Sequence, residues 1–289
     1  MPRITSSDCS IHYDVVGNGP PLVLIAGWGC TSEVWDPIIG KLASQYQCIR
    51  IDNRGTGQSS SSARFYGVAT MAKDILAVLD DLGIDSAHIL GNSLGGMVAQ
   101  AFARNHPERT RTLTLISSSP GVPSLPSHAA LAFPMLRSIG QKTAETLHLP
   151  LMHGPGKTPE FGGVSLPPFD QASRRQLIAT LSWWGIIQAR GIHAPSLIVH
   201  GTRDPIIPQG NARLMRRLLP NARLRLIRGA THGILSEAGD LVAAHVLAFL
   251  AANQATLPTP GRSKGRVLPA PALPLAPPKV LPSGLGGVA

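Results

Sequence analysis

Residues 88–100 read HILGNSLGGMVAQ, and this stretch decides the fold. An apolar run ends at Ser93, a glycine stands two positions away on each side, and an apolar run then resumes. The pattern predicts a strand over residues 87–92, a sharp turn at Ser93 and a helix over residues 94–105. Side chains two positions from the centre of so tight a turn would collide, which accounts for the two glycines.

The segments on both sides of this turn alternate between strand and helix patterns. Continuous apolar strands alternating with helices indicate an α/β fold with a mainly parallel sheet covered on both faces. We expect strands at residues 10–16, 21–27, 47–53, 87–92, 111–118, 195–201 and 222–229. We expect helices at residues 33–44, 69–82, 94–105, 207–219 and 236–252.

The alternation breaks once, and the break divides the chain. We predict a core of residues 1–118 and 191–253, a lid inserted over residues 119–190 and a tail over residues 254–289. The lid starts with Pro, Gly and Ser and includes a long helical stretch over residues 169–191. An insertion above the strand ends of such a sheet usually covers a site. The proline-rich tail is predicted to be disordered.

The charge balance argues against one class of partner. The net charge is +10, and four basic residues but no acidic ones lie after Asn253, which leaves +6 for the rest. Only 4% of the residues are aromatic, so little is available to stack on bases, and we expect no nucleic-acid partner. A basic surface favours an anionic substrate, or contact with a granule or membrane surface.

Cysteine usage and hydropathy point to the cytoplasm. Cys9, Cys30 and Cys48 are scattered, odd in number and without metal-ligand spacing, which fits reduced thiols and no metal site. The first twenty residues lack the apolar run of a signal peptide. No stretch reaches the roughly 18 uncharged apolar residues that a membrane span needs. We therefore expect a cytoplasmic protein with no transmembrane segment.

Ser93 is a candidate nucleophile, because the turn lifts its hydroxyl out at the carboxyl end of the sheet. At the head of a helix, free N–H groups and the helix dipole favour a developing negative charge. The alternative is an ordinary glycine-rich turn, since G-x-S-x-G on its own is common. A serine hydroxyl is a poor nucleophile without a base, so the interpretation depends on finding one.

His232 is the candidate base, because it directly follows the strand expected at residues 222–229. The other histidines lie in strand patterns, helices, loops or the lid, where packing is the simpler role. Asp204 follows the strand at residues 195–201 and is the candidate acid that orients the imidazole, although an aspartate before proline is also a common turn residue. Asp52 is the rival acid, but it heads a glycine-rich turn where structural hydrogen bonding is the simpler role.

Acyl transfer also needs hydrogen-bond donors for the negatively charged oxygen of the tetrahedral intermediate. One candidate is the backbone N–H of Leu94, next to the nucleophile. The other is the backbone N–H of Trp28, in the loop after the second expected strand. That loop also contains Gly27-x-Gly29, which begins a dinucleotide-binding pattern, but Ser32 stands where its third glycine belongs.

Several separate segments together resemble the α/β-hydrolase superfamily over residues 10–252, namely LVLIAGWG, IDNRGTGQSS, HILGNSLGGMVAQ, HGTRDPIIP and GATHG. The resemblance implies a mostly parallel eight-stranded sheet with helices on both faces and a helical lid. It implies a serine hydrolase that cleaves carboxylic esters through an acyl-enzyme, with Ser93, Asp204 and His232 as its catalytic residues and no cofactor. Ala26 stands where many members have histidine, so the oxyanion loop must be oriented from elsewhere.

Within the superfamily, the lid and the segment after it resemble intracellular medium-chain polyhydroxyalkanoate depolymerases, on SSSPGVPSLPSH, RRQLIATLSWWGII and HAPSLIVHGTRDPIIPQGNARLMRRLLPNARLRLI. The resemblance implies hydrophobic medium-chain esters or the polyester as substrate, with association at the granule surface. Those enzymes usually have tryptophan after the serine, where this chain has Leu94. In the lid, we expect Phe133, Leu181 and Trp184 to contact the acyl chain of the substrate.

Other functions on the same fold stay open. The segment GWGCTSEVWDP looks equally like small esterases and enol-lactonases. The alternatives are therefore a small-molecule esterase or enol-lactonase, and a ligand-binding protein that keeps the triad but turns over slowly. The sequence carries no signal for the oligomeric state.

Overall fold

The computed structural model describes residues 2–122 and 170–254. These residues form an eight-stranded sheet in the order β1-β2-β4-β3-β5-β6-β7-β8. The pairs β1–β2 and β2–β4 are antiparallel and every other pair is parallel, which confirms the predicted mainly parallel α/β sheet. The strands are β1 (Arg3–Ser6), β2 (Cys9–Val16), β3 (Pro21–Ile25), β4 (Gln47–Ile51), β5 (Ala87–Asn92), β6 (Thr110–Ile116), β7 (Ser196–Gly201) and β8 (Ala222–Ile227).

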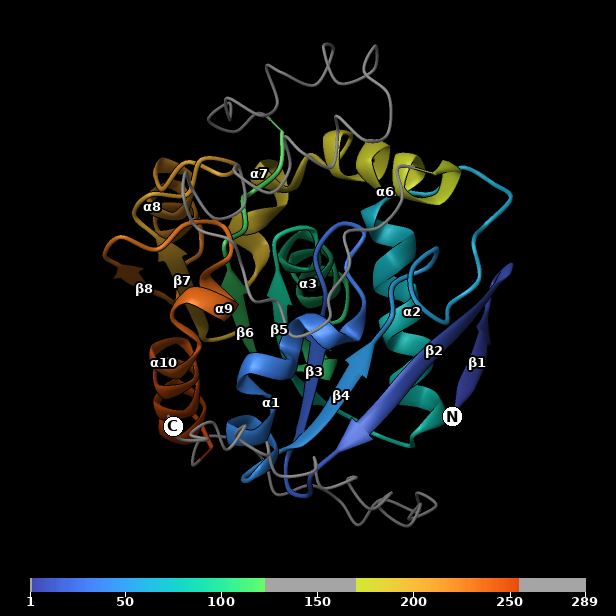
Figure 1. The fold of residues 1–289 in the computed structure, drawn as a ribbon, viewed down its shortest axis with the longest axis horizontal. Coiled ribbons are helices and arrows are strands. Elements are labelled where there is room, and N and C mark those ends of the chain that lie inside the picture. The colour runs from blue at the N-terminus through green and yellow to red at the C-terminus, as the bar shows by residue number, and fades with distance from the viewer. Residues whose placement is uncertain (1, 123–169, 255–289) are drawn as a thin grey trace, which may run out of the picture.

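Helices cover both faces of the sheet (Figure 1). The α-helices are α1 (Asp36–Ala43), α2 (Val68–Asp81), α3 (Leu94–Asn105), α6 (Gln171–Leu181), α7 (Gly185–Gln188), α8 (Gly210–Leu218), α9 (Ile234–Glu237) and α10 (Gly239–Ala252). Short 3₁₀ helices are η1 (Ser32–Trp35), η2 (Pro107–Arg109) and η3 (Ala189–Gly191). In β3, Val23 and Ile25 pack into the core beneath α2, α3 and α8, whereas Leu22 and Leu24 pack into the core beneath α1 and α10. This alternation explains the continuous apolar strands, because both faces of the sheet are buried.

The register of the parallel strands brings their carboxyl ends to one edge. Ile25 at the end of β3 pairs with Gly91 in β5, whereas Asn92 pairs with Ile116 in β6. Ile116 in turn pairs with Val199 in β7. The loops after β3, β5, β6 and β7 therefore leave the sheet side by side. Helices α6 and α7 lie above this edge (Figure 1).

The long helical stretch expected at residues 169–191 is broken in the structure. Helix α6 ends at Leu181, and α7 begins at Gly185. Between them, the side chain of Trp183 turns into the core that contains α3, where it is 7% exposed. A Cβ atom at Gly185 would lie 2.1 Å from Nε1 of Trp183, so the chain can turn here only at a glycine. The insertion of one indole thus overrides the helical pattern.

Several sequence-based expectations fall partly or wholly outside the described residues. Most of the predicted lid does so, including Phe133, and so does nearly all of the predicted tail. The limits of both stay predictions. The strand β1 was not expected from the sequence, because four residues are too few to show an alternating hydrophobic pattern.

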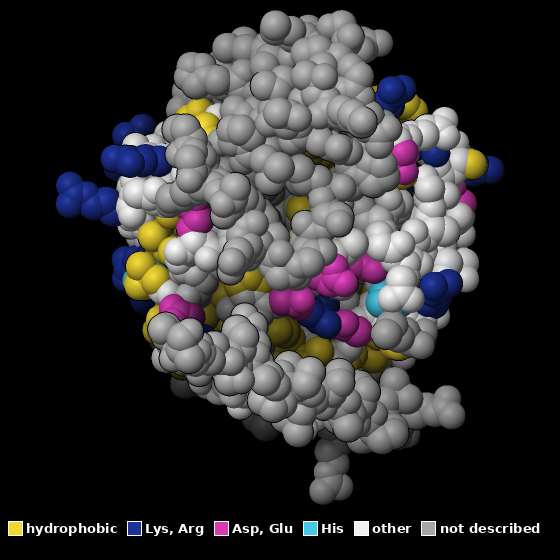
Figure 2. Space-filling model, in the orientation of Figure 1, with side chains coloured by type: hydrophobic (Ala, Val, Ile, Leu, Met, Phe, Trp, Pro, Cys, Tyr) yellow, Lys and Arg dark blue, Asp and Glu magenta, His cyan; other side chains and the backbone are white. Residues whose placement is uncertain are grey.

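The surface can be followed in part in Figure 2. On this face, Lys and Arg side chains of the described residues lie mainly around the margins, and acidic side chains gather nearer the middle. Arg50 forms ion pairs with Asp14 and Asp36, which neutralise its charge. The described Lys and Arg side chains that this view shows are thus dispersed around its margins. Of the helices in the described part of the chain, none combines the length and the apolar character needed to cross a membrane.

Candidate active site

Ser93 lies between β5 and α3 with φ 53° and ψ −117°, a conformation that residues other than glycine seldom adopt. A Cβ atom at Gly91 would lie 2.2 Å from the carbonyl oxygen of Gly95, and one at Gly95 would lie 2.1 Å from that of Ile25. The sharp turn inferred from sequence therefore requires glycine at both positions. The hydroxyl of Ser118, after β6, donates to the carbonyl oxygen of Ser93 at 2.8 Å and braces the turn.

The structure brings the three predicted catalytic side chains together. The Nε2 atom of His232 lies 3.1 Å from Oγ of Ser93, and its Nδ1 atom lies 2.8 Å from Oδ2 of Asp204. Asp204 follows β7 and His232 follows β8, so both reach the carboxyl edge of the sheet. This arrangement allows Nε2 to accept a proton from the serine while the carboxylate holds the Nδ1–H of the imidazole.

The surroundings of Asp204 favour its ionised form. Its Oδ1 atom accepts the backbone N–H groups of Ile206 at 2.9 Å and Ile207 at 2.8 Å. Burial alone would raise the pKa of Asp204, but His232, with smaller contributions from His200 and the Ile207 N–H, outweighs burial and lowers that pKa. An ionised carboxylate at this place stabilises a positively charged imidazole next to it.

His200 packs beside the same carboxylate. It lies in β7, and its Nε2–H donates to the carbonyl oxygen of Ile207 at 2.8 Å. The same Nε2 atom is 3.5 Å from Oδ2 of Asp204. Burial lowers the pKa of His200, which favours the neutral ring. The packing role expected from its strand pattern therefore includes support of the turn that carries Asp204.

The loop after β3 lies against the nucleophile. A Cβ atom at Gly27 would lie 3.3 Å from Cβ of Ser93, and the N–H of Cys30 donates to the carbonyl oxygen of Gly27 at 3.2 Å. The amide of Trp28, the next residue, is thus close to Ser93. Leu94 is the first residue of α3, where N–H groups have no acceptor within the helix. Both positions suit the expected oxyanion donors, whose role stays a prediction.

Two side chains that sequence reasoning missed orient this loop, which lacks a histidine at Ala26. The Nδ2 atom of Asn53 donates to the carbonyl oxygen of Ala26 at 2.9 Å. The Oε1 atom of Gln176 on α6 accepts the N–H of Gly29 at 2.8 Å. Asn53 had a signal in the sequence, because it directly follows the strand before a glycine-rich turn. Gln176 had none, because it is one polar residue within a helical pattern.

The rival acid, Asp52, forms hydrogen bonds that hold loops of the fold together. Its Oδ1 atom accepts the N–H of Ser32 at 2.8 Å, and its Oδ2 atom accepts that of Gln58 at 2.9 Å. Its Oδ2 atom also lies 3.2 Å from Nδ1 of His12. Asp52 therefore ties loops together, as its turn indicated, and the carboxylate that contacts the candidate base belongs to Asp204.

Two of the three lid residues expected to bind substrate are described. Leu181 is the last residue of α6 and Trp184 directly precedes α7, and their side chains are 47% and 52% exposed. The neighbouring Trp183 is buried in the core instead. The contact of Leu181 and Trp184 with an acyl chain stays a prediction, as does that of Phe133, which lies outside the described residues.

Comparisons with known proteins agree with this geometry. The chain matches the family described as alpha/beta hydrolase fold over residues 20–145 and 155–238. It is 30% identical to a poly(3-hydroxyalkanoate) depolymerase of Ectopseudomonas oleovorans over 80% of this chain and 84% of that protein. It is also 30% identical to a non-heme haloperoxidase of Rhodococcus erythropolis over 86% of this chain and 99% of that protein.

A solved structure supports the same fold. The crystal structure of the enol-lactonase from Burkholderia xenovorans LB400 superposes with a TM-score of 0.79 at 23% identity, over 86% of this chain and all of that one. Because the identity is low, this likeness concerns the fold alone. Together with the sheet order and the turn at Ser93, the family match is decisive. The chain is a hydrolase of the α/β-hydrolase fold family.

Proposed function

We propose that this protein is a serine esterase that cleaves carboxylic esters through an acyl-enzyme. The observation that carries the proposal is the continuous chain of hydrogen bonds from Asp204 through His232 to Ser93. The strained backbone of Ser93 and the adjacent loop at Gly27 add the environment that an activated serine requires.

The first half of the reaction forms the acyl-enzyme. Oγ of Ser93 bonds to the ester carbonyl carbon while Nε2 of His232 takes its proton. The carbonyl oxygen becomes negatively charged and accepts hydrogen bonds from the amides of Trp28 and Leu94. When the carbon–oxygen bond of the ester breaks, His232 gives its proton to the departing alcohol. Asp204 stabilises the charged imidazole between these two steps.

The second half releases the acid. A water molecule replaces the alcohol, and His232 accepts its proton as the water oxygen bonds to the acyl carbon. The bond from that carbon to Oγ of Ser93 then breaks, and the proton returns to the serine. The carboxylic acid departs and the free enzyme is restored. Every proton and acyl transfer uses side chains of this chain and water alone.

Medium-chain hydrophobic esters, including polyhydroxyalkanoates and their oligomers, are the substrates that we infer. The identity to a protein named as a poly(3-hydroxyalkanoate) depolymerase supports this substrate class. Large apolar side chains on the segment above the sheet edge support it as well. Ile178, Leu181, Trp184 and Ile187 are 41%, 47%, 52% and 74% exposed. Such surfaces favour an apolar acyl chain over a small polar substrate.

Hydrolysis of p-nitrophenyl esters from acetate to palmitate, with purified wild type and Ser93→Ala, tests the proposal. We expect turnover to peak at medium acyl chains and to fall at least about 10⁴-fold in Ser93→Ala. A medium-chain polyhydroxyalkanoate emulsion should then clear with the wild type alone. Near-normal turnover by Ser93→Ala would refute the serine mechanism.

The alternative of a small-molecule esterase or enol-lactonase gives a different profile. Serine-dependent turnover confined to short soluble esters or lactones, with no clearing of the emulsion, would favour it. Leu94, in place of the tryptophan usual among the depolymerases, is the residue that keeps this alternative in view. A folded protein that a fluorophosphonate probe fails to label would instead favour a ligand-binding role.

A further inference from the structure

Gln176 is a fully buried polar residue on a helix above the sheet edge, and both ends of its amide are bonded to backbone. Its Oε1 atom accepts the N–H of Gly29 at 2.8 Å. Its Nε2 atom donates to the carbonyl oxygen of Arg54 at 2.9 Å. One side chain thus joins the loop after β3 to the turn after β4, two segments that share no strand pairing at this point. Because both the oxygen and the nitrogen of this buried amide form hydrogen bonds, the side chain is held in one orientation between the two segments.

The segment from Ala26 to Cys30, here called the oxyanion loop, is held from two sides. Asn53 holds the carbonyl oxygen of Ala26 from the body of the protein. Helix α6 holds the other end through Gln176, and the indole Nε1–H of Trp28 donates to the carbonyl oxygen of Ser173 on the same helix at 2.7 Å. The amide of Trp28 lies between these fixed points, next to the position at Gly27 that faces the nucleophile.

We propose that Gln176 is a positioning residue that sets the Trp28 amide at the angle and distance the oxyanion needs. The proposal rests on the serine esterase mechanism given above. Gly29 has φ +65°, so the loop backbone passes through a conformation that it can readily leave when an anchor is lost. An oxyanion donor displaced by about 1 Å costs roughly 10²-fold in rate. The role of Gln176 is therefore exerted through Trp28 and not by contact with substrate.

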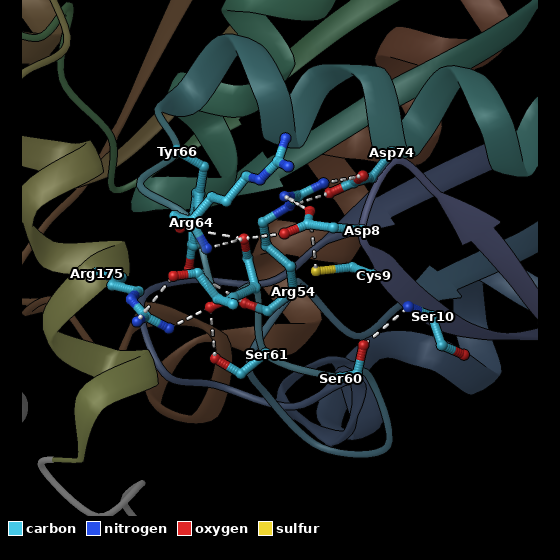
Figure 3. Close-up of polar contacts among 12 residues, drawn as sticks. Asp8, Cys9, Ser10, Arg54, Ser60, Ser61, Arg64, Tyr66, Asp74 and Arg175 are labelled. Carbon is cyan, nitrogen blue, oxygen red and sulfur yellow. Dashed lines mark hydrogen bonds and ion pairs between the residues drawn. The ribbon is translucent and has the colours of Figure 1, made fainter.

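Helix α6 has anchors that do not involve the oxyanion loop. Arg175 reaches from α6 to the loop that carries Ser61 (Figure 3), where it donates to the carbonyl oxygens of Ser62 and Ala63, the latter at 3.2 Å. Ala172 packs at Gly55, where an added Cβ would lie 2.9 Å from the Ala172 side chain. Loss of the Gln176 amide alone therefore leaves α6 attached to the body.

The matched pair Gln176→Met and Arg175→Met separates positioning from general attachment of the helix. Methionine matches glutamine in length and is close to it in volume, and it removes both hydrogen bonds. We expect kcat on a medium-chain p-nitrophenyl ester to fall by about 10- to 100-fold in Gln176→Met, with KM changed by less than about threefold. Arg175→Met should lower the melting temperature while kcat per folded molecule stays near the wild-type value.

A second variant, Gln176→Glu, gives a pH dependence of kcat that a purely packing role of this side chain would not produce. In Gln176→Glu, the protonated carboxyl group has one acceptor for Gly29 and one donor for the carbonyl of Arg54, as glutamine has. The ionised form has no proton for Arg54, and burial favours the neutral form. The ratio of variant to wild-type kcat should therefore rise as pH falls. This readout also decides the question if Gln176→Met fails to fold.

The outcomes distinguish this inference from the proposed function. Equal kcat losses in Gln176→Met and Arg175→Met, or a pH-independent ratio for Gln176→Glu, would overturn the positioning role. Neither result affects the esterase mechanism, which is tested separately by the turnover of Ser93→Ala and by labelling with a fluorophosphonate probe. A loss of kcat in Gln176→Met that exceeds the loss in Arg175→Met, together with a ratio that rises at low pH, supports the inference.

Discussion

The guanidinium of Arg54 and the carboxylate of Asp74 form a buried ion pair with two hydrogen bonds. Nε of Arg54 lies 2.7 Å from one carboxylate oxygen, and Nη2 lies 2.6 Å from the other. Both side chains are almost fully buried, and the guanidinium also lies 5.0 Å from the ring centre of Tyr66 (Figure 3). The pair fixes the turn after β4 to α2. That turn presents the carbonyl oxygen to which Gln176 donates.

Removal of one member of this pair should destabilise the protein strongly. Asp74→Asn removes the closer and more buried of two carboxylates at the guanidinium, and leaves Asp8, whose Oδ1 atom lies 3.6 Å from Nη1 of Arg54. We expect a loss of about 3 kcal/mol in the free energy of unfolding. Asp80→Asn is the control, because Asp80 is 58% exposed in its pair with Arg109 and should cost less than about 1 kcal/mol. Urea unfolding measures both, and equal losses would contradict the prediction.

The two candidate acids should separate activity from stability. Asp204→Asn presents an amide to Nδ1 of His232 and favours the tautomer with its proton on Nε2, which cannot accept the proton of Ser93. We expect kcat to fall by about 10⁴-fold with the fold intact. Asp52→Asn removes an acceptor for a buried N–H and should cost about 1–3 kcal/mol of stability, with activity per folded molecule retained. Kinetics corrected for the folded fraction test the pair, and the reverse pattern would assign the acid to Asp52.

The elbow glycines should tolerate no side chain. In Gly91→Ala, the new methyl group would lie 2.2 Å from a backbone oxygen that cannot move without disruption of α3. We expect either loss of soluble protein or loss of activity with a large drop in melting temperature. Gly40→Ala in α1 is the control, since nothing lies within 4 Å of an added Cβ there. It should be neutral or stabilise by up to about 1 kcal/mol.

His88 should make the protein less stable in mild acid. Burial, with a smaller contribution from Arg111, lowers the pKa of His88 from 6.5 to about 4. Between these two pKa values the unfolded chain binds a proton that the folded protein excludes. The contribution of the neutral His88 ring to the free energy of unfolding is therefore fully present above pH 6.5 and is lost as pH falls toward 4. The loss attributable to this ring is up to about 3 kcal/mol.

Unfolding of wild type and His88→Gln at pH 8 and at pH 4.5 measures this contribution. At pH 8 the difference reports the loss of packing and of the hydrogen bond to Thr112, which is 2.8 Å long. At pH 4.5 the wild type should lose more stability than the variant does. Parallel losses in the two proteins would show that the buried ring is protonated in the folded state.

Local patterns were enough to predict the nucleophile turn and the elements next to it. The strand and helix on either side of Ser93 begin and end as expected, at residues 87–92 and 94–105. Their periods are local, and the glycines mark the turn between them. The order Ser93, Asp204, His232 also followed from positions just after strands, because parallel strands bring such positions to one edge.

Features that depend on distant packing could not be predicted in this way. The bond from Gly29 to Gln176 joins residues 147 positions apart, and no local pattern marks a glutamine that will face a loop. The break between α6 and α7 arises because Trp183 enters a core built by other segments. The helical period of residues 171–188 does not indicate that Trp183 will pack into that core.

The two hydrogen bonds of Gln176 also limit how this protein can be recombined with its relatives. A chimaera that exchanged the whole of residues 119–190 would discard the amide between Gly29 and Arg54. One buried donor and one buried acceptor on the recipient backbone would then need new partners. A crossover placed before α6, which leaves this helix with the recipient, keeps both backbone groups satisfied while the remaining insert changes.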